Sequence, residues 1–212
     1  MADCPDVPLV SVAMLTYNQK QYVHEAVASI LGQSWPRLEI IICDDASQDG
    51  TQEVISRLVS NYDGPHAVKF VKNIENLGLI GNINKANSLC SGDYIVFSAG
   101  DDLSDPDRVA RTIREFSGQD TLLVCSDVEF IDERGARLPR PSHLAPLFHQ
   151  RFTIYEAAQS MSLYIGATGA ISKKLIDAFP PLSVHGCYED LAFGFRAALL
   201  GRVKFVDEPL VK

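Results

Sequence analysis

The segments Leu38–Asp45 (LEIIICDD) and Tyr94–Asp102 (YIVFSAGDD) share one arrangement, an apolar run that ends in a pair of aspartates. Leu9–Leu15 (LVSVAML) is a third, mostly apolar run. Short runs of this kind, without regular polar alternation, are typical of strands that are buried on both faces of a sheet. The sequence therefore predicts a sheet with covering layers on both sides.

The segments between these runs have the spacing of amphipathic helices. Apolar residues recur on one helical face in Gln21–Gly32, in Val54–Val59 and in the more polar Ile80–Cys90. Val68–Val71 is a further short strand, and the pair Asp105-Pro106 predicts another helix, because Asp is a favoured N-cap and proline suits the first turn. Strands that alternate with helices predict an α/β fold with a doubly wound, mostly parallel sheet.

The second half of the chain has a less regular pattern. It contains a predicted strand at Leu122–Ser126, a predicted hairpin at Val128–Leu138 and a predicted helix at Asp190–Leu200. Thr153 with Glu156 has the spacing of a capping box at a helix start.

The length of 212 residues allows one or two domains. No linker separates the two patterns. We therefore expect one domain over residues 1–212, with a regular half at about 1–103 and an irregular half at about 104–212.

Charge and cysteine content exclude several classes of protein. The chain has 19 basic and 27 acidic residues, a net charge of −8, which opposes non-specific binding to nucleic acid and to anionic lipid. No apolar run reaches ~18 residues and no signal-like start is present, so neither a transmembrane segment nor secretion is predicted. Five cysteines without a Cys-x-x-Cys pair favour reduced thiols in a cytoplasmic protein over disulfides or a zinc site: Cys4, Cys43, Cys90, Cys125 and Cys187.

The two aspartate pairs, Asp44-Asp45 and Asp101-Asp102, follow predicted strands. In open α/β sheets, ligands bind beyond the carboxyl ends of the strands, so four carboxylates are expected at one rim. Adjacent carboxylates raise each other's pKa unless a cation or hydrogen-bond donors compensate. Since Mg²⁺ and Mn²⁺ bind one or two carboxylates together with phosphate oxygens, the pairs predict a cation shared with a phosphate-bearing ligand. The alternative is that these aspartates only end strands and cap turns.

Glycine-rich phosphate-binding motifs do not occur in the sequence. There is no G-x-x-x-x-G-K-[ST], and the turn after the first strand is Thr16-Tyr17-Asn18 rather than G-x-G-x-x-G. Those glycines let the backbone approach phosphates closely. Their absence argues against dehydrogenases and P-loop NTPases.

Several short motifs of the first half occur in a defined order: Leu9–Asn18, Gln33-Ser34, Glu39–Asp45 with Ser47, Gly50 and Thr51, Asn76–Gly78, Gly92–Ile95 and Asp101-Asp102. In the second half, Glu189-Asp190 is followed by Arg196-Ala197 and Gly201. Together these motifs resemble glycosyltransferase family 2, whose fold is GT-A. The resemblance extends over about Leu9–Val211 and implies a nucleotide-sugar-binding first half and an acceptor-binding second half.

Members of that family transfer a sugar from a nucleotide donor, usually with inversion at the anomeric carbon and with Mn²⁺ or Mg²⁺. The resemblance implies that Thr16 and Tyr17, with Asn18, lie beside the nucleoside and that Asp45 reads a uracil ring. Asn76 belongs to the Asn-x-Gly turn of the same binding site.

The resemblance also assigns the later acids. It implies that Asp101 and Asp102 contact the ribose and the metal-bound diphosphate, with Asp102 as the main metal ligand. It implies Asp190 as the catalytic base, with Glu189 as the alternative. Such a base takes a proton from the acceptor hydroxyl, while a cation neutralises the departing diphosphate. Both acids would open a helix whose dipole favours the ionised carboxylate, so only burial would raise their pKa; without the family context they would be a helix cap.

The chain departs from the family pattern at two positions. Ala99 stands where many members have a further acid, and Ile83 stands where many have an arginine near the nucleotide. The diphosphate contact would then fall to Lys85, whose alternative is a solvated helix lysine. Relatives also generally continue beyond the position of Lys212, so a segment that closes over the donor is expected beyond it.

These observations predict a metal-dependent inverting glycosyltransferase that moves a sugar, from a UDP-linked donor, to a hydroxyl of a saccharide or lipid-linked saccharide in cell-surface polysaccharide synthesis. We expect a cytoplasmic location, including the inner face of the membrane. The alternatives are a non-catalytic nucleotide-binding domain of the same fold and a sugar-phosphate nucleotidyltransferase. Donor and acceptor specificity are expected in Pro139–Gly169, where Tyr164–Gly169 either lines an acceptor cleft or packs in the core.

Overall fold

The computed structural model describes residues 7–116, 120–141, 153–160, 163–183 and 188–212. Within them, seven strands form one sheet in the order β3-β2-β1-β4-β6-β5-β7. The strands are β1 (Val10–Thr16), β2 (Leu38–Asp44), β3 (Ala67–Lys72), β4 (Tyr94–Ala99), β5 (Thr121–Val128), β6 (Ala170–Ser172) and β7 (Arg202–Val211). The helices are α1 (Val23–Leu31), α2 (Thr51–Ser60), α3 (Gly78–Leu89), α4 (Arg108–Arg114), α5 (Ile154–Gln159), α6 (Lys173–Asp177), α7 (Glu189–Leu200) and the 3₁₀ helix η2 (Gly166–Thr168).

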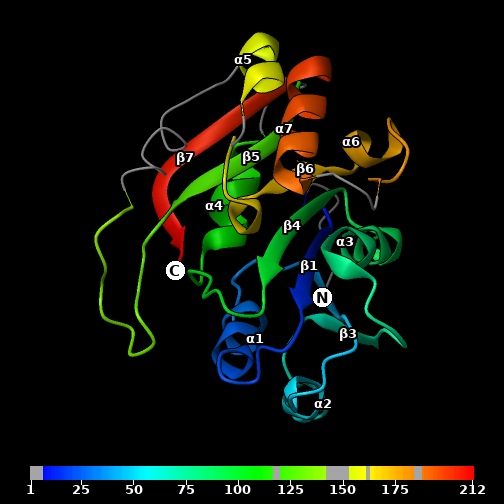
Figure 1. Cartoon of the computed structure of the whole chain (residues 1–212), viewed down its shortest axis with the longest axis vertical. Coiled ribbons are helices and arrows are strands. Elements are labelled where there is room, and N and C mark those ends of the chain that lie inside the picture. Colours follow the sequence, from blue (N-terminus) through cyan, green and yellow to red (C-terminus); the bar gives the residue numbers. More distant parts are fainter. Residues whose placement is uncertain (1–6, 117–119, 142–152, 161–162, 184–187) are drawn as a thin grey trace.

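The predicted α/β fold with a mostly parallel sheet is confirmed. β1 pairs in parallel with both β2 and β4, β2 pairs in parallel with β3, and β5 pairs in parallel with β7. The short β6 is antiparallel to β4 and β5 and joins the two groups of strands. Figure 1 shows β1 and β4 side by side with their arrows in the same direction. Their carboxyl ends therefore share one rim of the sheet, where ligands bind in such folds.

Successive residues of the central strands enter different cores, because side chains alternate across a strand. Ile40 and Ile42 of β2 pack in the core that contains α1, α2 and α4. Ile41 and Cys43 pack in the core that contains α3, α6 and α7. This double burial explains the unbroken apolar run in the sequence.

Several local predictions are confirmed. Thr153 and Glu156 form the capping box at the start of α5. Cys43, Cys90 and Cys125 are buried free thiols, and burial raises the pKa of each to about 11 or 12, whereas Cys4 and Cys187 lie outside the described residues. In the predicted hairpin, Ile131 and Arg137 form only an isolated antiparallel bridge.

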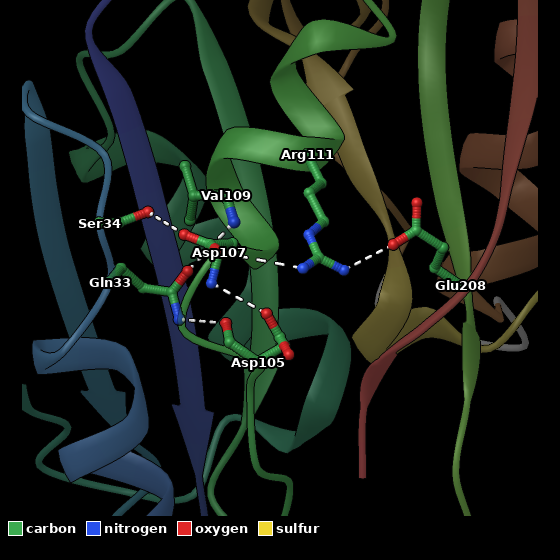
Figure 2. Close-up of polar contacts among 7 residues, drawn as sticks. All are labelled: Gln33, Ser34, Asp105, Asp107, Val109, Arg111 and Glu208. Carbon is green, nitrogen blue, oxygen red and sulfur yellow. Dashed lines mark hydrogen bonds and ion pairs between the residues drawn. The ribbon is translucent and has the colours of Figure 1, made fainter.

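The prediction that Asp105 is the N-cap of α4 is wrong, because Asp107 holds that position, although Asp105 Oδ1 accepts from the Asp107 N–H at 2.9 Å. The helix begins at Arg108, and the backbone N–H of Val109 is capped by Gln33 Oε1 at 3.1 Å. Gln33 follows α1 and is buried, and its Nε2 donates to the carbonyl of Asp105 at 2.8 Å (Figure 2). A side chain 76 residues away therefore caps and positions α4.

Exposed polar residues also contact α4 close to Gln33. Ser34 Oγ donates to Asp107 at 2.8 Å, and Arg111 bridges Asp107 and Glu208 of β7 (Figure 2).

The strand β7 was not predicted. It is an edge strand in which Pro209 is tolerated. Among the described helices, none combines the length and the apolar character of a membrane span.

Candidate active site

A cavity of about 480 Å³, here called the central cavity, lies at the carboxyl ends of β1 and β4. Its volume falls within the range of small-molecule sites. Its wall combines residues from the loops after β1 and β2, from the start of α3, from the end of β4, from η2 and from the start of α7. Among the residues predicted for the site, five line it: Thr16, Tyr17, Asp45, Asn76 and Glu189.

Asp44, the first acid of its pair, is fully buried and does not face this cavity. Its Oδ2 accepts from the hydroxyls of Thr16 at 2.9 Å and Ser47 at 2.6 Å, and its Oδ1 accepts from the Ser47 N–H at 2.9 Å and from Gln52 Nε2 at 2.6 Å. Thr16 and Asp44 are also register partners in β1 and β2. The expectation of four carboxylates at one rim is therefore wrong, because Asp44 has its hydrogen-bond partners inside the fold.

Asp45 is also buried, but it lines the cavity. Its Oδ1 accepts from Asn73 Nδ2 at 2.9 Å and from the Leu77 N–H at 2.8 Å. Ala46 has a φ of 62°, so the backbone turns sharply after Asp45. This turn separates the environments of two acids that are adjacent in sequence.

Of four other residues predicted to bind the nucleotide, two line the central cavity and two do not. Tyr17 is exposed at the mouth of the cavity, and Asn76 lines it while its Oδ1 accepts from the Gly78 N–H at 2.8 Å. Asn18, with a φ of 51°, joins the loops after β1 and β2 through Ser47 and Gln48. Neither Asn18 nor the exposed Lys85 is among the residues that line the central cavity.

The acid pair Asp101-Asp102 lies just beyond the part of the wall formed by Ala99. Asp101 is exposed and lines a second cavity of about 740 Å³ that also includes Tyr22 and Glu25. Asp102 is partly buried; burial and the neighbouring Asp101 raise its pKa to about 6, against the opposing effect of Arg108. A cation would offset both of these unfavourable effects on the charged form.

No group of three or more metal-ligating side chains occurs among the described residues. Mg²⁺ and Mn²⁺ do not need one, because they bind one or two carboxylates together with phosphate oxygens and water. Asp101 and Asp102 are the residues of this rim that could hold such an ion. Their number fits a cation that completes its coordination with a bound diphosphate.

Arg108, which the sequence analysis did not identify, is a fully buried arginine that interacts electrostatically with Asp102. It donates to Ser104 Oγ at 3.0 Å, to the carbonyl of Phe97 at 2.7 Å and to the carbonyl of Ala167. Burial lowers its pKa to about 10, while Asp102 opposes this shift. Arg108 thus connects the end of β4 to η2, which lines the cavity.

Glu189 and Asp190 are the first two residues of α7. Glu189 lines the cavity, and burial, together with Asp190, raises its pKa. Burial also raises the pKa of Asp190, whose Oδ1 accepts from the Leu191 N–H at 2.7 Å and which does not line the cavity. Desolvation is thus the largest cause of the raised pKa of both acids. This agrees with the sequence analysis, in which only burial could raise a pKa at a helix start.

The segment around η2 has both of the roles considered for it. Gly166 and Ala167 line the cavity, whereas Tyr164 is buried in the core beside α7. A side chain on Gly166 would overlap Glu189 Oε1. The contact that a larger residue would make here is with α7, so no local pattern could have revealed it.

Comparisons with known proteins concern the family and the fold. The family model described as "Glycosyl transferase family 2" matches residues 11–199. The chain is 39% identical over 106 residues to the putative glycosyltransferase EpsE of Bacillus subtilis, covering 50% of this chain and 37% of that protein. It is 36% identical over 119 residues to a chondroitin synthase of Escherichia coli, covering 56% of this chain and 17% of that protein. The chain thus spans well under half the length of either relative.

Two solved structures share the fold. The mannosyltransferase PcManGT from Pyrobaculum calidifontis, in complex with GDP-Man and Mn²⁺, has a TM-score of 0.75 at 22% identity, over 95% of this chain and 55% of that one. TarS of S. aureus, residues 1–349 in complex with UDP-GlcNAc, has a TM-score of 0.70 at 20% identity, over 96% of this chain and 57% of that one.

Proposed function

Because the chain belongs to glycosyltransferase family 2, we propose that it is the catalytic domain of an enzyme that transfers a sugar from a nucleotide donor to a hydroxyl acceptor in polysaccharide synthesis. One observation carries the proposal: a single cavity is lined by Asp45 from the first half and by Glu189 from the second. We assign 1–103 to the donor and 104–212 to the acceptor, as two halves of one domain. Pairing of β4 with β6 joins these halves in one sheet.

The donor nucleoside is assigned to the wall formed by Tyr17, Asp45 and Asn76. The exposed ring of Tyr17 offers a surface for a base or ribose, and Asp45 offers a carboxylate oxygen. The family resemblance favours a UDP-linked donor. Two neighbours of the same fold are complexes with GDP-Man and UDP-GlcNAc, so UDP and GDP are both included in the binding test below.

Asp101 and Asp102 are assigned to a divalent cation, Mn²⁺ or Mg²⁺. When bound, such an ion would neutralise the charge that develops on the departing diphosphate. The neighbour PcManGT is a complex with Mn²⁺. The raised pKa of Asp102 supports this assignment, because a nearby cation would favour its charged form.

We assign Asp190 as the base that removes the proton of the acceptor hydroxyl, because it matches the family motif, and Glu189 is the competing base. A carboxylate whose pKa is raised by burial is a stronger base than an exposed one. Attack from the α7 side, opposite the diphosphate, would invert the anomeric centre. The cavity-facing position of Glu189 makes it the residue to test beside Asp190.

A non-catalytic nucleotide-binding domain is the second candidate. Ala99 lines the cavity where many family members have an acid, and Ile83 lines it in place of an arginine. Both substitutions would weaken the binding of a metal-bound diphosphate.

A thermal-shift panel of UDP, GDP, dTDP, CMP and ATP, each with Mn²⁺, Mg²⁺ or EDTA, tests the donor site. A ligand at 100 times its dissociation constant stabilises by about 2.7 kcal/mol, which shifts Tm by several degrees. A shift that depends on the metal supports the donor site, and release of nucleoside diphosphate from nucleotide sugars separates the enzyme from the binding domain. The absence of any nucleotide shift would contradict both.

A further inference from the structure

Two buried asparagines, Asn73 and Asn82, are linked to Asp45 by hydrogen bonds. Asn73 directly follows β3, and Asn82 lies in the second turn of α3. Asn73 is 9% exposed and Asn82 is 3% exposed. Asn82 forms part of the cavity wall, whereas Asn73 does not line the cavity. Two amides in such a position need hydrogen-bond partners, and those partners reveal their role.

The hydrogen bonds have only one possible direction. Asn82 Nδ2 donates to the carbonyl of Cys43 at 3.0 Å, because a carbonyl can only accept. Asn82 Oδ1 is therefore turned toward Asn73 and accepts from its Nδ2 at 3.0 Å. The same Nδ2 donates its second hydrogen to Asp45 Oδ1 at 2.9 Å. The backbone of β2 thus fixes the orientation of both amides and presents a donor to Asp45.

The two polar atoms of the Asn73 amide differ in the number of hydrogen bonds that they make. Its Nδ2 makes two hydrogen bonds, while its buried Oδ1 accepts none from the residues that the structure describes. A buried acceptor without a partner costs stability. The amide is thus placed for its donor group, which points at Asp45, and not for general support of the loop.

The two oxygens of Asp45 consequently differ. Oδ1 accepts two hydrogen bonds, from Asn73 and from the Leu77 N–H at 2.8 Å. Oδ2 accepts none within the described part of the chain, and Asp45 faces the cavity. A carboxylate held in this way offers one oriented acceptor to a ligand.

We propose that Asn73 and Asn82 are positioning residues that make the donor site selective for a nucleobase with a ring N–H. Uracil and guanine carry such a group next to a carbonyl, whereas cytosine and adenine have a lone pair at the corresponding nitrogen, which a carboxylate repels. Fixed orientation matters because it holds the free oxygen toward the ligand, whereas a carboxylate that can turn away is repelled less by a base that lacks the N–H. This inference rests on the donor site proposed above.

The test measures dissociation constants of UDP, CDP, GDP and ADP with Mn²⁺, by calorimetry, for the wild type and for Asn73→Ala. We expect the wild type to prefer UDP or GDP over CDP and ADP. Because a hydrogen bond to a charged group is lost, Asn73→Ala should lower the preferred affinity about tenfold and the CDP affinity less than about twofold. A merely structural role would reduce all affinities by the same factor.

Asn84→Ala is the matched control. Asn84 lies on α3, the helix that also contains Asn82. Its side chain makes two hydrogen bonds, both to the backbone of Leu182, and none to Asp45. It should lower Tm without changing the ratio of affinities. Asn82→Ala is the second variant, and it should reproduce the loss of selectivity seen with Asn73→Ala.

The outcomes separate this inference from the function on which it depends. A wild type that binds none of the four nucleotides overturns the donor site and the inference with it. A wild type that binds without preference, or that prefers CDP or ADP, overturns the inference alone. So does a preference that both variants retain. If neither variant folds, a wild-type structure with the preferred nucleotide decides, since Asp45 Oδ2 must lie within hydrogen-bond distance of the ring nitrogen.

Discussion

The carboxylate of Glu189, the first residue of α7, lies against the backbone of Gly166, the first residue of η2. Both residues line the central cavity. A methyl group on Gly166 would overlap Glu189 Oε1, which is the flexible end of that side chain. The glycine thus gives Glu189 the space in which its carboxylate faces the cavity.

Gly166→Ala should therefore displace Glu189 without unfolding the protein. The φ of Gly166 is not in the left-handed region, so alanine fits the backbone. Because Glu189 is only the competing base, we expect turnover to fall by less than about tenfold, with Tm nearly unchanged; a fall of roughly 10- to 100-fold, as for small misplacements of reacting groups, would favour Glu189 as the base. Gly32→Ala, whose new methyl would make only an ordinary contact with Ala28 at 3.4 Å, is the control. Unchanged turnover in Gly166→Ala would mean that the Glu189 position is not needed.

Asp190→Asn and Glu189→Gln together identify the base. Each change removes one carboxylate and keeps its shape. We expect Asp190→Asn to lower turnover roughly 10²- to 10⁴-fold, the size of a general-base effect, while nucleotide affinity stays within a few-fold. Glu189→Gln should cost less than about tenfold. The reverse order of the two effects in steady-state kinetics would move the base to Glu189.

The pH dependence of turnover should report the burial of these acids. Burial raises the pKa of Glu189 and of Asp190 above the ordinary carboxylate values. A general base acts in its ionised form, so turnover should rise with pH through this raised pKa and not near the ordinary value. The acid limb of the kcat profile should disappear in Asp190→Asn. An acid limb at the pH typical of exposed carboxylates would contradict the desolvated base.

Asp102→Asn tests the metal ligand. The amide keeps the shape of Asp102 but removes the charge that a cation would compensate. We expect the Mn²⁺-dependent part of the UDP thermal shift, several degrees near saturation, to vanish. Asp107→Asn is the control, because Asp107 is an exposed aspartate at the start of α4. A full metal-dependent shift in Asp102→Asn would remove this residue from the metal site.

Gln33→Ala tests the remote cap of α4 shown in Figure 2. The variant loses the cap on the Val109 N–H and leaves buried partners unpaired, which should cost about 2 kcal/mol in the free energy of unfolding. Ser34→Ala removes only an exposed hydrogen bond to Asp107 and should cost less than about 0.5 kcal/mol. Urea denaturation measures both. Equal costs for the two variants would show that the cap is not a major support of α4.

Local patterns were sufficient to predict much of the fold. The apolar runs of β1, β2 and β4 indicate strands buried on both faces, since each side of such a strand meets a different core. The capping box of Thr153 and Glu156 was also readable, because its two partners are three residues apart. The edge strand β7 was missed: its exposed positions and Pro209 interrupt the pattern, and pairing with β5 compensates for both.

Without the family resemblance, the site could be predicted only as a set of acids near strand ends and at a helix start. The local pattern does not distinguish Asp44, which is bonded inside the fold, from Asp45, which faces the cavity; only the family resemblance singled out Asp45. The difference depends on a backbone turn at Ala46 and on Asn73, which is 28 residues from Asp45. Arg108 and Asn82 gave no signal at all, because polar residues in a helix pattern are normally assigned to the surface.

The amino-acid sequence by itself determined the α/β class and the positions of the acid pairs after their strands, because periodicity and strand termination depend on neighbouring residues. Only the tertiary structure decided that Asp45 lines the cavity while Asp44 does not, that Gln33 caps α4, and that Asn82 and Asn73 orient Asp45. These features are hydrogen bonds between residues that are distant in the chain. Their existence depends on which groups the folded sheet brings within about 3 Å of each other, and no local pattern encodes that distance.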